Sequence, residues 1–169
     1  DAVGDLTEPR EVDDARVGRA AGHDHLGLVL LGELAHLAHV DAVVVAVLGN
    51  PGKQPLFSVD ERVAMLKEAT TGLDNVDVES FSGLLVEYAR RKGSDLIVKG
   101  LRAVTDFEYE IQMAQMNRRL TGMETLFMTT DPTWSFLSSS LVREVARFGG
   151  DVSELVPSVV VDRLAERFG

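Results

Sequence analysis

The sequence alternates short, β-branched apolar runs with segments of helical periodicity, and this alternation constrains the fold more than any other feature. The first clear run is AVVVAVL at 42–48, which predicts a buried strand that ends at Asn50-Pro51-Gly52. Shorter runs predict strands at 76–79, 95–98 and 125–129. Because parallel strands need helical crossovers, this order predicts an α/β fold with a parallel sheet that helices cover on both faces.

Capping signals place helices between these strands. Ser58 with Glu61, and Thr105 with Glu108, form capping boxes that predict helix starts at 58 and 105. Gly93 is expected to close a helix, because glycine adopts the left-handed conformation at little cost. The expected helices cover residues 58–69, 82–92, 105–120, 138–148 and 158–168, with a short turn capped by Asp151 and Glu154 before the last one.

Composition excludes several classes of protein. The 169 residues contain no cysteine, which rules out a disulfide scaffold, a thiolate zinc site and a cysteine nucleophile. The formal net charge of −10 argues against nucleic acid as a partner, since phosphate backbones need clustered lysine and arginine. The apolar runs are far shorter than the roughly 18 residues that cross a bilayer. We therefore expect one cytoplasmic domain spanning residues 1–169, with no membrane partner.

Residues 1–49 differ from the rest of the chain in composition. They use only ten amino-acid types, whereas the other ten types supply 37 of the following 120 residues. Apart from Thr7, every residue in this segment can have a codon that begins with G or C. A GC-rich gene read out of frame gives this pattern. For residues 1–41 we therefore weigh two explanations, a frame-shifted stretch and a natural Ala/Val-rich segment.

The same segment leads to a structural prediction. Residues 1–40 have neither an alternating nor a 3.6-residue apolar face before Leu26, so they should not form a tightly packed first strand and helix. All four histidines lie here, and His23 and His25 resemble half of a metal site. Because no third ligand is evident nearby, we expect no metal site.

Polar and charged residues collect where the expected strands end. Asn50 and Lys53 follow the first strand, and residues 80–85 follow the second. Residues 99–102 follow the third strand, and residues 130–140 follow the fourth. Ligands of parallel sheets bind beyond the carboxyl ends of the strands. The sequence therefore predicts a ligand site at this edge.

Two of these stretches suit phosphate. The run WSFLSSS at 134–140 leads into a helix, whose unpaired N–H groups and neighbouring hydroxyls suit a nucleotide phosphate. The alternative is an ordinary N-cap, which needs only one serine. Lys99-Gly100-Leu101-Arg102 puts two cations around a glycine, where a backbone can approach a ligand closely. The alternative there is a solvated loop.

For other residues, the sequence pattern alone indicates an ordinary structural role. Lys53 by itself is typical of a surface lysine, and Asp106 and Glu110 read as a solvated helix face. A helical pattern of methionines indicates core or subunit interface, at positions Met113, Met116 and Met123.

Taken together, the motifs resemble a known family. From about residue 40 to 169 the chain is similar to the phosphopantetheine adenylyltransferases, in NPGKQPLFSVDERVAML, KGLRAVTDFEYEIQMAQMNRRL and WSFLSSSLVREVARFGGDVSELVP. The resemblance implies a Rossmann-like, doubly wound parallel sheet of adenylyltransferase type with C-terminal helices, in a homohexamer. It implies adenylyl transfer from ATP, with Mg²⁺, to 4′-phosphopantetheine, giving dephospho-coenzyme A and pyrophosphate. It also implies coenzyme A as a feedback ligand.

The resemblance further implies roles for individual residues. Phosphopantetheine contacts fall on Lys53, Leu85 and Lys99, and Lys99 stands where many members have arginine. ATP contacts fall on the strand-end motif, one helical carboxylate and the serine-rich run: Gly100, Leu101, Arg102, Glu110, Trp134, Ser135, Phe136, Leu137, Ser138, Ser139 and Ser140.

The family's first loop has no counterpart in this chain. Members carry P-G-[ST]-F-D-P and then T-x-G-H, whose histidine stabilises the transition state. The nearest match, Ala20-Ala21-Gly22-His23, lacks the threonine, so His23 is a weak candidate and no catalytic residue is assigned. Two alternatives remain open. One is a non-catalytic nucleotide- or coenzyme A-binding protein; the other is a nucleotidyltransferase for a different phosphate acceptor, against which TDFEYE argues.

Overall fold

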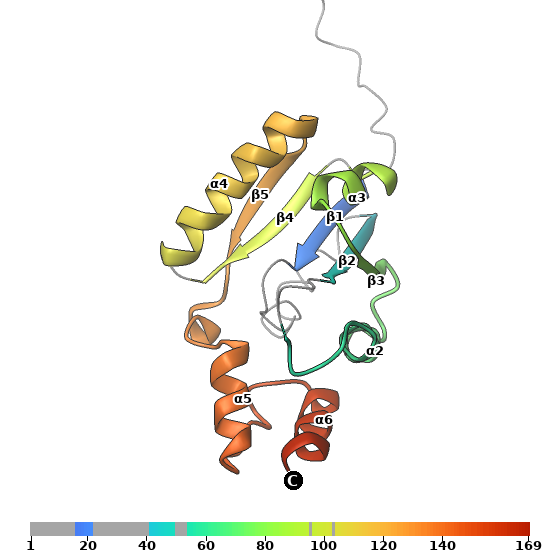
Figure 1. Ribbon diagram of the computed structural model, residues 1–169. Helices are drawn as coiled ribbons and strands as arrows, with labels where there is room; N and C mark the ends of the chain where they lie inside the picture. Colours follow the sequence, from blue (N-terminus) through green and yellow to red (C-terminus); the bar gives the residue numbers. More distant parts are fainter. Residues whose placement is uncertain (1–15, 22–40, 50–53, 95, 103) are drawn as a thin grey trace, which may run out of the picture.

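The computed structural model describes residues 16–21, 41–49, 54–94, 96–102 and 104–169. In this part of the chain, parallel strands form one sheet in the order β3-β2-β1-β4-β5 (Figure 1). The strands are β1 (Arg16–Ala21), β2 (Ala42–Leu48), β3 (Val76–Phe81), β4 (Leu96–Leu101) and β5 (Glu124–Thr129). The helices are α2 (Val59–Ala69), α3 (Leu85–Arg91), α4 (Val104–Thr121), α5 (Ser139–Arg147) and α6 (Ser158–Phe168), with a 3₁₀ turn, η2 (Pro132–Trp134).

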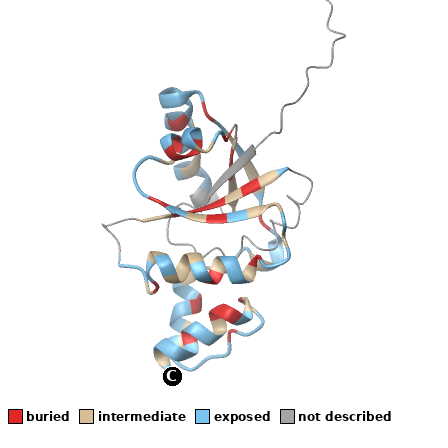
Figure 2. Ribbon diagram, turned by 90° about the vertical axis from the view of Figure 1, so that its right-hand side faces the viewer, coloured by how far each residue is buried: buried red, intermediate tan, exposed pale blue. Residues whose placement is uncertain are grey.

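Helices cover both faces of the sheet, as the alternation of the sequence predicts. Val43, Val45 and Val47 of β2 pack in one cluster with Val63 of α2. Ala46, which lies between Val45 and Val47 in the strand, packs instead with Tyr88 of α3. Successive side chains of a strand point to opposite faces, so both faces of β2 are buried. Helix α4 packs along β4 and β5. Buried residues accordingly run along the strands and the inner turns of the helices (Figure 2). The predicted α/β class is confirmed.

The prediction that residues 1–40 lack a first strand is wrong for residues 16–21. Strand β1 lies at the centre of the sheet, where Arg16 is in register with Ala42 of β2 and Val17 with Leu96 of β4. A parallel ladder is built from backbone N–H and C=O groups, so a segment without an alternating apolar pattern can still complete the sheet. The rest of that segment lies outside the described residues.

Several element boundaries differ from the prediction, and strand β3 for example continues to Phe81, two residues beyond its expected end. Strand β4 continues to Leu101, three residues beyond its expected end, because Leu101 still pairs with Thr129 of β5. Helix α3 starts at Leu85 rather than at 82, since Gly83 has a φ of +90° that a helix cannot contain. Helix α4 begins at Val104, so the expected N-cap residue Thr105 lies inside the helix.

The other helix signals are confirmed. Ser58 Oγ accepts a hydrogen bond from the Glu61 amide at 3.2 Å, and Glu61 Oε2 accepts one from the Ser58 amide at 2.7 Å. This reciprocal pair is the predicted capping box of α2. In the turn before α6, Asp151 Oδ1 accepts a hydrogen bond from the Ser153 amide at 2.9 Å.

Helices α5 and α6 lie beyond the arrowheads of the strands (Figure 1). They share a core with the residue before the N-cap of α2, with α2 itself and with the loop that precedes α5. The largest buried side chains of this core are Phe57, Met65, Leu137 and Leu164. This second core therefore faces the edge of the sheet where ligands are expected. No described helix is long and apolar enough to span a membrane.

Candidate active site

The described strands all run parallel, so their carboxyl ends meet at one edge of the sheet. The chain winds outward from β1 to β3 on one side and then crosses to β4 and β5 on the other. Ligands of doubly wound sheets bind at the point where this direction reverses, between β1 and β4. The KGLR motif lies at the end of β4, beside this reversal.

Lys99 and Glu110 form an ion pair at this edge. Lys99 Nζ of β4 lies 3.3 Å from Glu110 Oε2 of α4, and the two side chains are only 12% and 13% exposed. The reading of Glu110 as part of a solvated helix face is therefore wrong. The resemblance assigns Lys99 to phosphopantetheine and Glu110 to ATP, and the structure brings the two side chains together. A largely buried ion pair depends on both partners, because removing one leaves the other charge uncompensated.

The end of β4 is also tied to the serine-rich loop. Arg102 donates a hydrogen bond from Nη1 to the carbonyl oxygen of Leu137 at 2.7 Å. The Leu101 carbonyl accepts hydrogen bonds from the amide and the Oγ1 of Thr130, at 3.0 and 3.2 Å. These bonds cross from β4 to the segment that follows β5. The alternative of a solvated loop at 99–102 therefore does not hold, since residues 99–101 belong to the strand and all four are at least partly buried.

Local hydrogen bonds shape the loop between β5 and α5. Ser135 Oγ donates to the Pro132 carbonyl at 2.9 Å, and the Leu137 amide donates to the Trp134 carbonyl at 2.9 Å. Ser138 caps α5 by accepting a hydrogen bond from the Leu141 amide at 3.2 Å. Ser138 is thus the structural N-cap, and the two serines that follow it are the first residues of the helix.

The side chains of this loop divide between core and solvent. Leu137 is 2% exposed and belongs to the core beneath α5 and α6. Trp134 is half-buried against the same core, whereas Phe136 is exposed. The side chain of Leu137 is therefore not available for a ligand, but its anchoring fixes the start of α5. The N–H groups and serine hydroxyls of that first turn have the chemistry of a phosphate site.

Leu85 lies at the other end of the sheet edge, beside the end of β3. It is the first residue of α3 and packs partly buried against two core clusters. Glu79 of β3 holds this helix in place, because its carboxylate accepts hydrogen bonds from Lys92 and from Tyr88, the latter at 3.0 Å. The Lys92 hydrogen bond keeps the pKa of Glu79 below its ordinary value. Burial, with the Glu79 hydrogen bond, raises the pKa of Tyr88.

Two predicted site residues, Lys53 and His23, lie outside the described residues. In the part of the chain that the structure describes, no group of three or more His, Asp or Glu side chains is placed to hold a metal ion.

A groove of about 530 Å³ lies between the carboxyl ends of α5 and α6, lined in part by Phe148 and Phe168. It contains none of the predicted site residues, so we do not assign it to the active site.

Sequence reasoning missed the hydrogen bonds that two residues make at this edge. Thr130 is buried and fixes the Leu101 carbonyl, as described above. Arg62 of α2 donates a hydrogen bond from Nη2 to the Leu48 carbonyl at the end of β2, at 3.2 Å. Thr130 begins the stretch 130–140 that the sequence placed at this edge, but nothing singled it out there, and Arg62 lies in no motif that suggests a site. An arginine in the middle of the apolar pattern of α2 was the available signal for Arg62.

The fold and the site together define a nucleotidyltransferase of the cytidylyltransferase-like class, whose family model matches residues 25–145 of this chain. A solved structure assigned as a nicotinate-nucleotide adenylyltransferase from Vibrio parahaemolyticus shares the fold. Its TM-score is 0.62 at 16% identity, and the match covers 89% of this chain and 99% of that one. The family match begins at residue 25, whereas the motif resemblance was expected to start at about residue 40.

Curated relatives narrow this class. The chain is 54% identical over 129 residues to the phosphopantetheine adenylyltransferase of Caldanaerobacter subterraneus subsp. tengcongensis, covering 76% of this chain and 81% of that protein. It is 57% identical over 128 residues to the phosphopantetheine adenylyltransferase of Heliobacterium modesticaldum, covering 75% of this chain and 76% of that protein. The chain belongs to the phosphopantetheine adenylyltransferase family.

Proposed function

We propose that this chain transfers the adenylyl group of ATP to 4′-phosphopantetheine, forming dephospho-coenzyme A and pyrophosphate. The observation that carries the proposal is the identity of 54% and 57% to two relatives of that name, over about three quarters of the chain. The cations and hydroxyls at the carboxyl edge of the sheet support it, because both substrates carry phosphate groups.

Each substrate is assigned a part of this edge. Phosphopantetheine binds to Lys53, Leu85 and Lys99. ATP binds to the end of β4, to α4 and to the loop before α5, through Gly100, Leu101, Arg102, Glu110, Trp134, Ser135, Phe136, Leu137, Ser138, Ser139 and Ser140. Of these, Leu137 can take part only through its backbone, because its side chain is buried. The half-buried position of Arg102 and its bond to the Leu137 carbonyl favour this division, since they hold its charge at the start of α5.

The reaction is an in-line displacement. A phosphate oxygen of phosphopantetheine attacks the α-phosphorus of ATP, and a new P–O bond forms as the bond to the bridging β-oxygen breaks. Pyrophosphate leaves with the electron pair. No protein nucleophile takes part, so the protein contributes positioning and charge neutralisation. Mg²⁺ enters with ATP, on whose phosphate oxygens it is carried. No catalytic residue is assigned, and His23 remains a weak candidate.

A coupled pyrophosphate assay tests this function. We expect release of pyrophosphate from ATP and Mg²⁺ only when 4′-phosphopantetheine is present. An equal response to nicotinamide mononucleotide or glycerol phosphate would favour a nucleotidyltransferase for another acceptor. Binding of ATP with no pyrophosphate from any acceptor would favour a non-catalytic nucleotide- or coenzyme A-binding protein.

We further propose that the protein is a cytoplasmic homohexamer regulated by coenzyme A. Exposed apolar side chains on α4 support self-association: Phe107, Tyr109, Met113, Met116 and Leu120. Met123, which follows that helix, is buried and belongs to the core. Light scattering of the wild type and Met116→Glu tests the assembly, and inhibition by added coenzyme A tests the regulation. Cell fractionation tests the location.

For the organisation of the chain, we propose one domain over residues 1–169, in which residues 1–41 are either a frame-shifted stretch or a natural Ala/Val-rich segment. The restricted composition of that segment is the observation that both explanations address. Sequencing the 5′ end of the gene distinguishes them. A T-x-G-H motif in another frame would favour the frame shift, and an uninterrupted reading frame without it would favour the natural Ala/Val-rich segment.

A further inference from the structure

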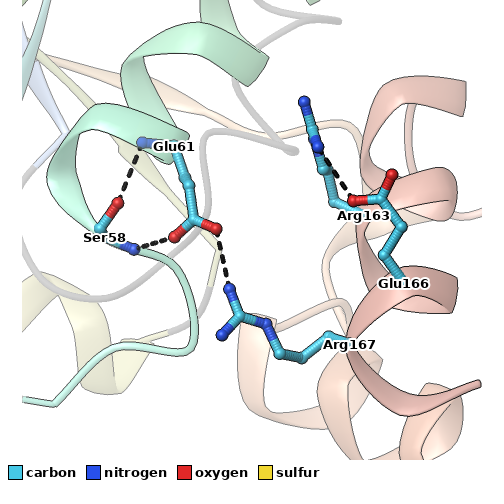
Figure 3. Close-up of polar contacts among 5 residues, drawn as sticks. All are labelled: Ser58, Glu61, Arg163, Glu166 and Arg167. Carbon is cyan, nitrogen blue, oxygen red and sulfur yellow. Dashed lines mark hydrogen bonds and ion pairs between the residues drawn. The ribbon is translucent and has the colours of Figure 1, made fainter.

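Helix α3, which begins at Leu85, has no side-chain cap at its start. Its N-cap residue, Leu84, makes no side-chain hydrogen bond, and Gly83 before it has a positive φ. Helix α2 differs, because the capping box between Ser58 and Glu61 closes its first turn (Figure 3). Helix α3 has only seven residues, and a helix this short is at best marginally stable in isolation. Its position must therefore come from contacts with the rest of the fold.

One side chain of β3 binds α3 at two points. Glu79 Oε2 accepts a hydrogen bond from the Tyr88 hydroxyl at 3.0 Å, and Glu79 Oε1 accepts one from Lys92 Nζ. Tyr88 lies in the middle of the helix, and Lys92 is its C-cap residue. The bond to Tyr88 is the more enclosed of the two, since Tyr88 is 7% exposed whereas the side chain of Lys92 is 36% exposed. Hydrogen bonds to a carboxylate are stronger than those between neutral groups, so Glu79 anchors the helix to the sheet.

Tyr88 connects this anchor to Leu85. Its ring stacks on that of Phe81, the last residue of β3, with the ring centroids 4.7 Å apart. Both rings are buried, and Leu85 packs against their cluster. Leu85 and Tyr88 are three residues apart in the helix, so their side chains are neighbours on its surface. A shift of α3 against β3 would therefore move Leu85 as well.

We propose that Glu79 is a positioning residue for phosphopantetheine: its carboxylate holds Tyr88 and so sets the place of Leu85 beside the end of β3. This inference rests on the proposed function, in which Leu85 binds phosphopantetheine. The side chain of Leu85 is apolar, so the contact that it offers depends on close packing and weakens with a small displacement. ATP is assigned to β4, α4 and the loop before α5, so the effect of Glu79 falls on phosphopantetheine.

Steady-state kinetics for both substrates test the proposal. Glu79→Ala removes both bonds to α3 and should raise KM for phosphopantetheine roughly three- to tenfold. We expect KM for ATP and kcat to stay within about twofold of wild type. Glu79→Gln keeps an oxygen that can accept the Tyr88 hydrogen bond, and should recover part of the loss. Tyr88→Phe removes only the hydroxyl, should raise the same KM, and carries the test if Glu79→Ala does not fold.

Glu87 supplies a matched control on α3. It is exposed and lies two residues after Leu85. Side chains two residues apart in a helix do not face each other, so Glu87 is turned away from Leu85. Glu87→Ala therefore removes an equivalent carboxylate without releasing α3 from β3, and should change none of the three kinetic constants.

A double variant tests the route through Leu85. Leu85→Ala shortens the side chain that Glu79 is inferred to position. If Glu79 acts through that side chain, the two changes are not additive, and Glu79→Ala in the Leu85→Ala background should raise KM for phosphopantetheine less than about twofold further. A further rise as large as that in the wild-type background would show that Glu79 does not act through Leu85, and would overturn the inference.

Hydrogen exchange measures positioning without activity. In the substrate-free protein, exchange at residues 85–91 should quicken in Glu79→Ala and in Tyr88→Phe, but not in Glu87→Ala, and exchange at α5 should not change. If wild type forms no dephospho-coenzyme A, the proposed function fails, while this measurement still tests the hold of Glu79 on α3. Unchanged exchange at residues 85–91, an equal rise of both KM values, or equal effects of Glu79→Ala and Glu87→Ala would overturn the inference.

Discussion

The guanidinium of Arg102 donates a hydrogen bond to the carbonyl oxygen of Leu137, and so joins the end of β4 to the residue before the N-cap of α5. Leu137 is itself fixed by the C-terminal core. The cation is therefore held beside the helix N-terminus whose N–H groups suit phosphate. Two favourable contributions to anion binding, a positive charge and a helix end, are brought together by one 2.7 Å contact.

Arg102→Ala should weaken ATP much more than phosphopantetheine. Charge-assisted hydrogen bonds to phosphate are worth about 1.5–3 kcal/mol, and each 1.4 kcal/mol is roughly tenfold in affinity. We expect calorimetry to show a loss of about tenfold or more for ATP. Arg102→Lys should lose less, because it keeps the charge but not the planar fork. Equal loss of both ligands would contradict the assignment of Arg102 to ATP.

The serines of the loop should separate into a structural and a binding group. Ser138→Ala removes the N-cap of α5 and should cost about 1 kcal/mol of unfolding free energy. The pair Ser139→Ala and Ser140→Ala leaves that cap in place and should weaken ATP binding instead. Thermal melting and ATP calorimetry on both variants check this. The separation fails if Ser138→Ala melts like wild type, or if the pair binds ATP normally.

Lys99 and Glu110 should be coupled in stability but not in substrate binding. Lys99→Met leaves the Glu110 carboxylate largely buried without its partner, and should cost about 1–3 kcal/mol. Adding Glu110→Gln removes that charge, so the double variant should recover part of the stability. Phosphopantetheine affinity should stay at least roughly tenfold weaker in both, as it should in Lys53→Ala. Chemical denaturation and calorimetry measure the two effects separately, and recovery of affinity in the double variant would contradict the role of Lys99.

Much of the fold follows from local signals in the sequence. The β-branched run at 42–48 is β2, and the Ser58–Glu61 capping box starts α2 with both of its hydrogen bonds. Ser138 and Phe148, the predicted ends of a helix, are the N-cap and C-cap of α5. Such features depend on neighbours within about four residues, so the sequence alone contains the information.

What could not be predicted depends on pairing between distant segments. Strand β1 has no apolar pattern that predicts it, and it is recognised only by its backbone pairing with β2 and β4 on either side. Residues 99–101 look like a loop until β5 pairs with them. Glu110 looks solvated on its own helix, but α4 packs against β4 and β5, and there Glu110 is largely buried and paired with Lys99. The edge that carries the site was predictable, but these contacts within it were not.

Acid should destabilise the protein partly through Glu79. Its folded-state pKa is lowered, first of all by the Lys92 hydrogen bond, so the folded chain binds this proton less readily than the unfolded chain. The stabilisation is therefore fully present above the ordinary value of 4.5 and is lost as the pH falls below it through the folded-state pKa. Glu79→Gln should lower stability at neutral pH and flatten its decline on acidification. Chemical denaturation between about pH 3 and pH 7 measures this, with exposed Glu87→Gln of α3 as the control. A Glu79→Gln curve that runs parallel to that of wild type would show that this carboxylate does not contribute to the acid sensitivity.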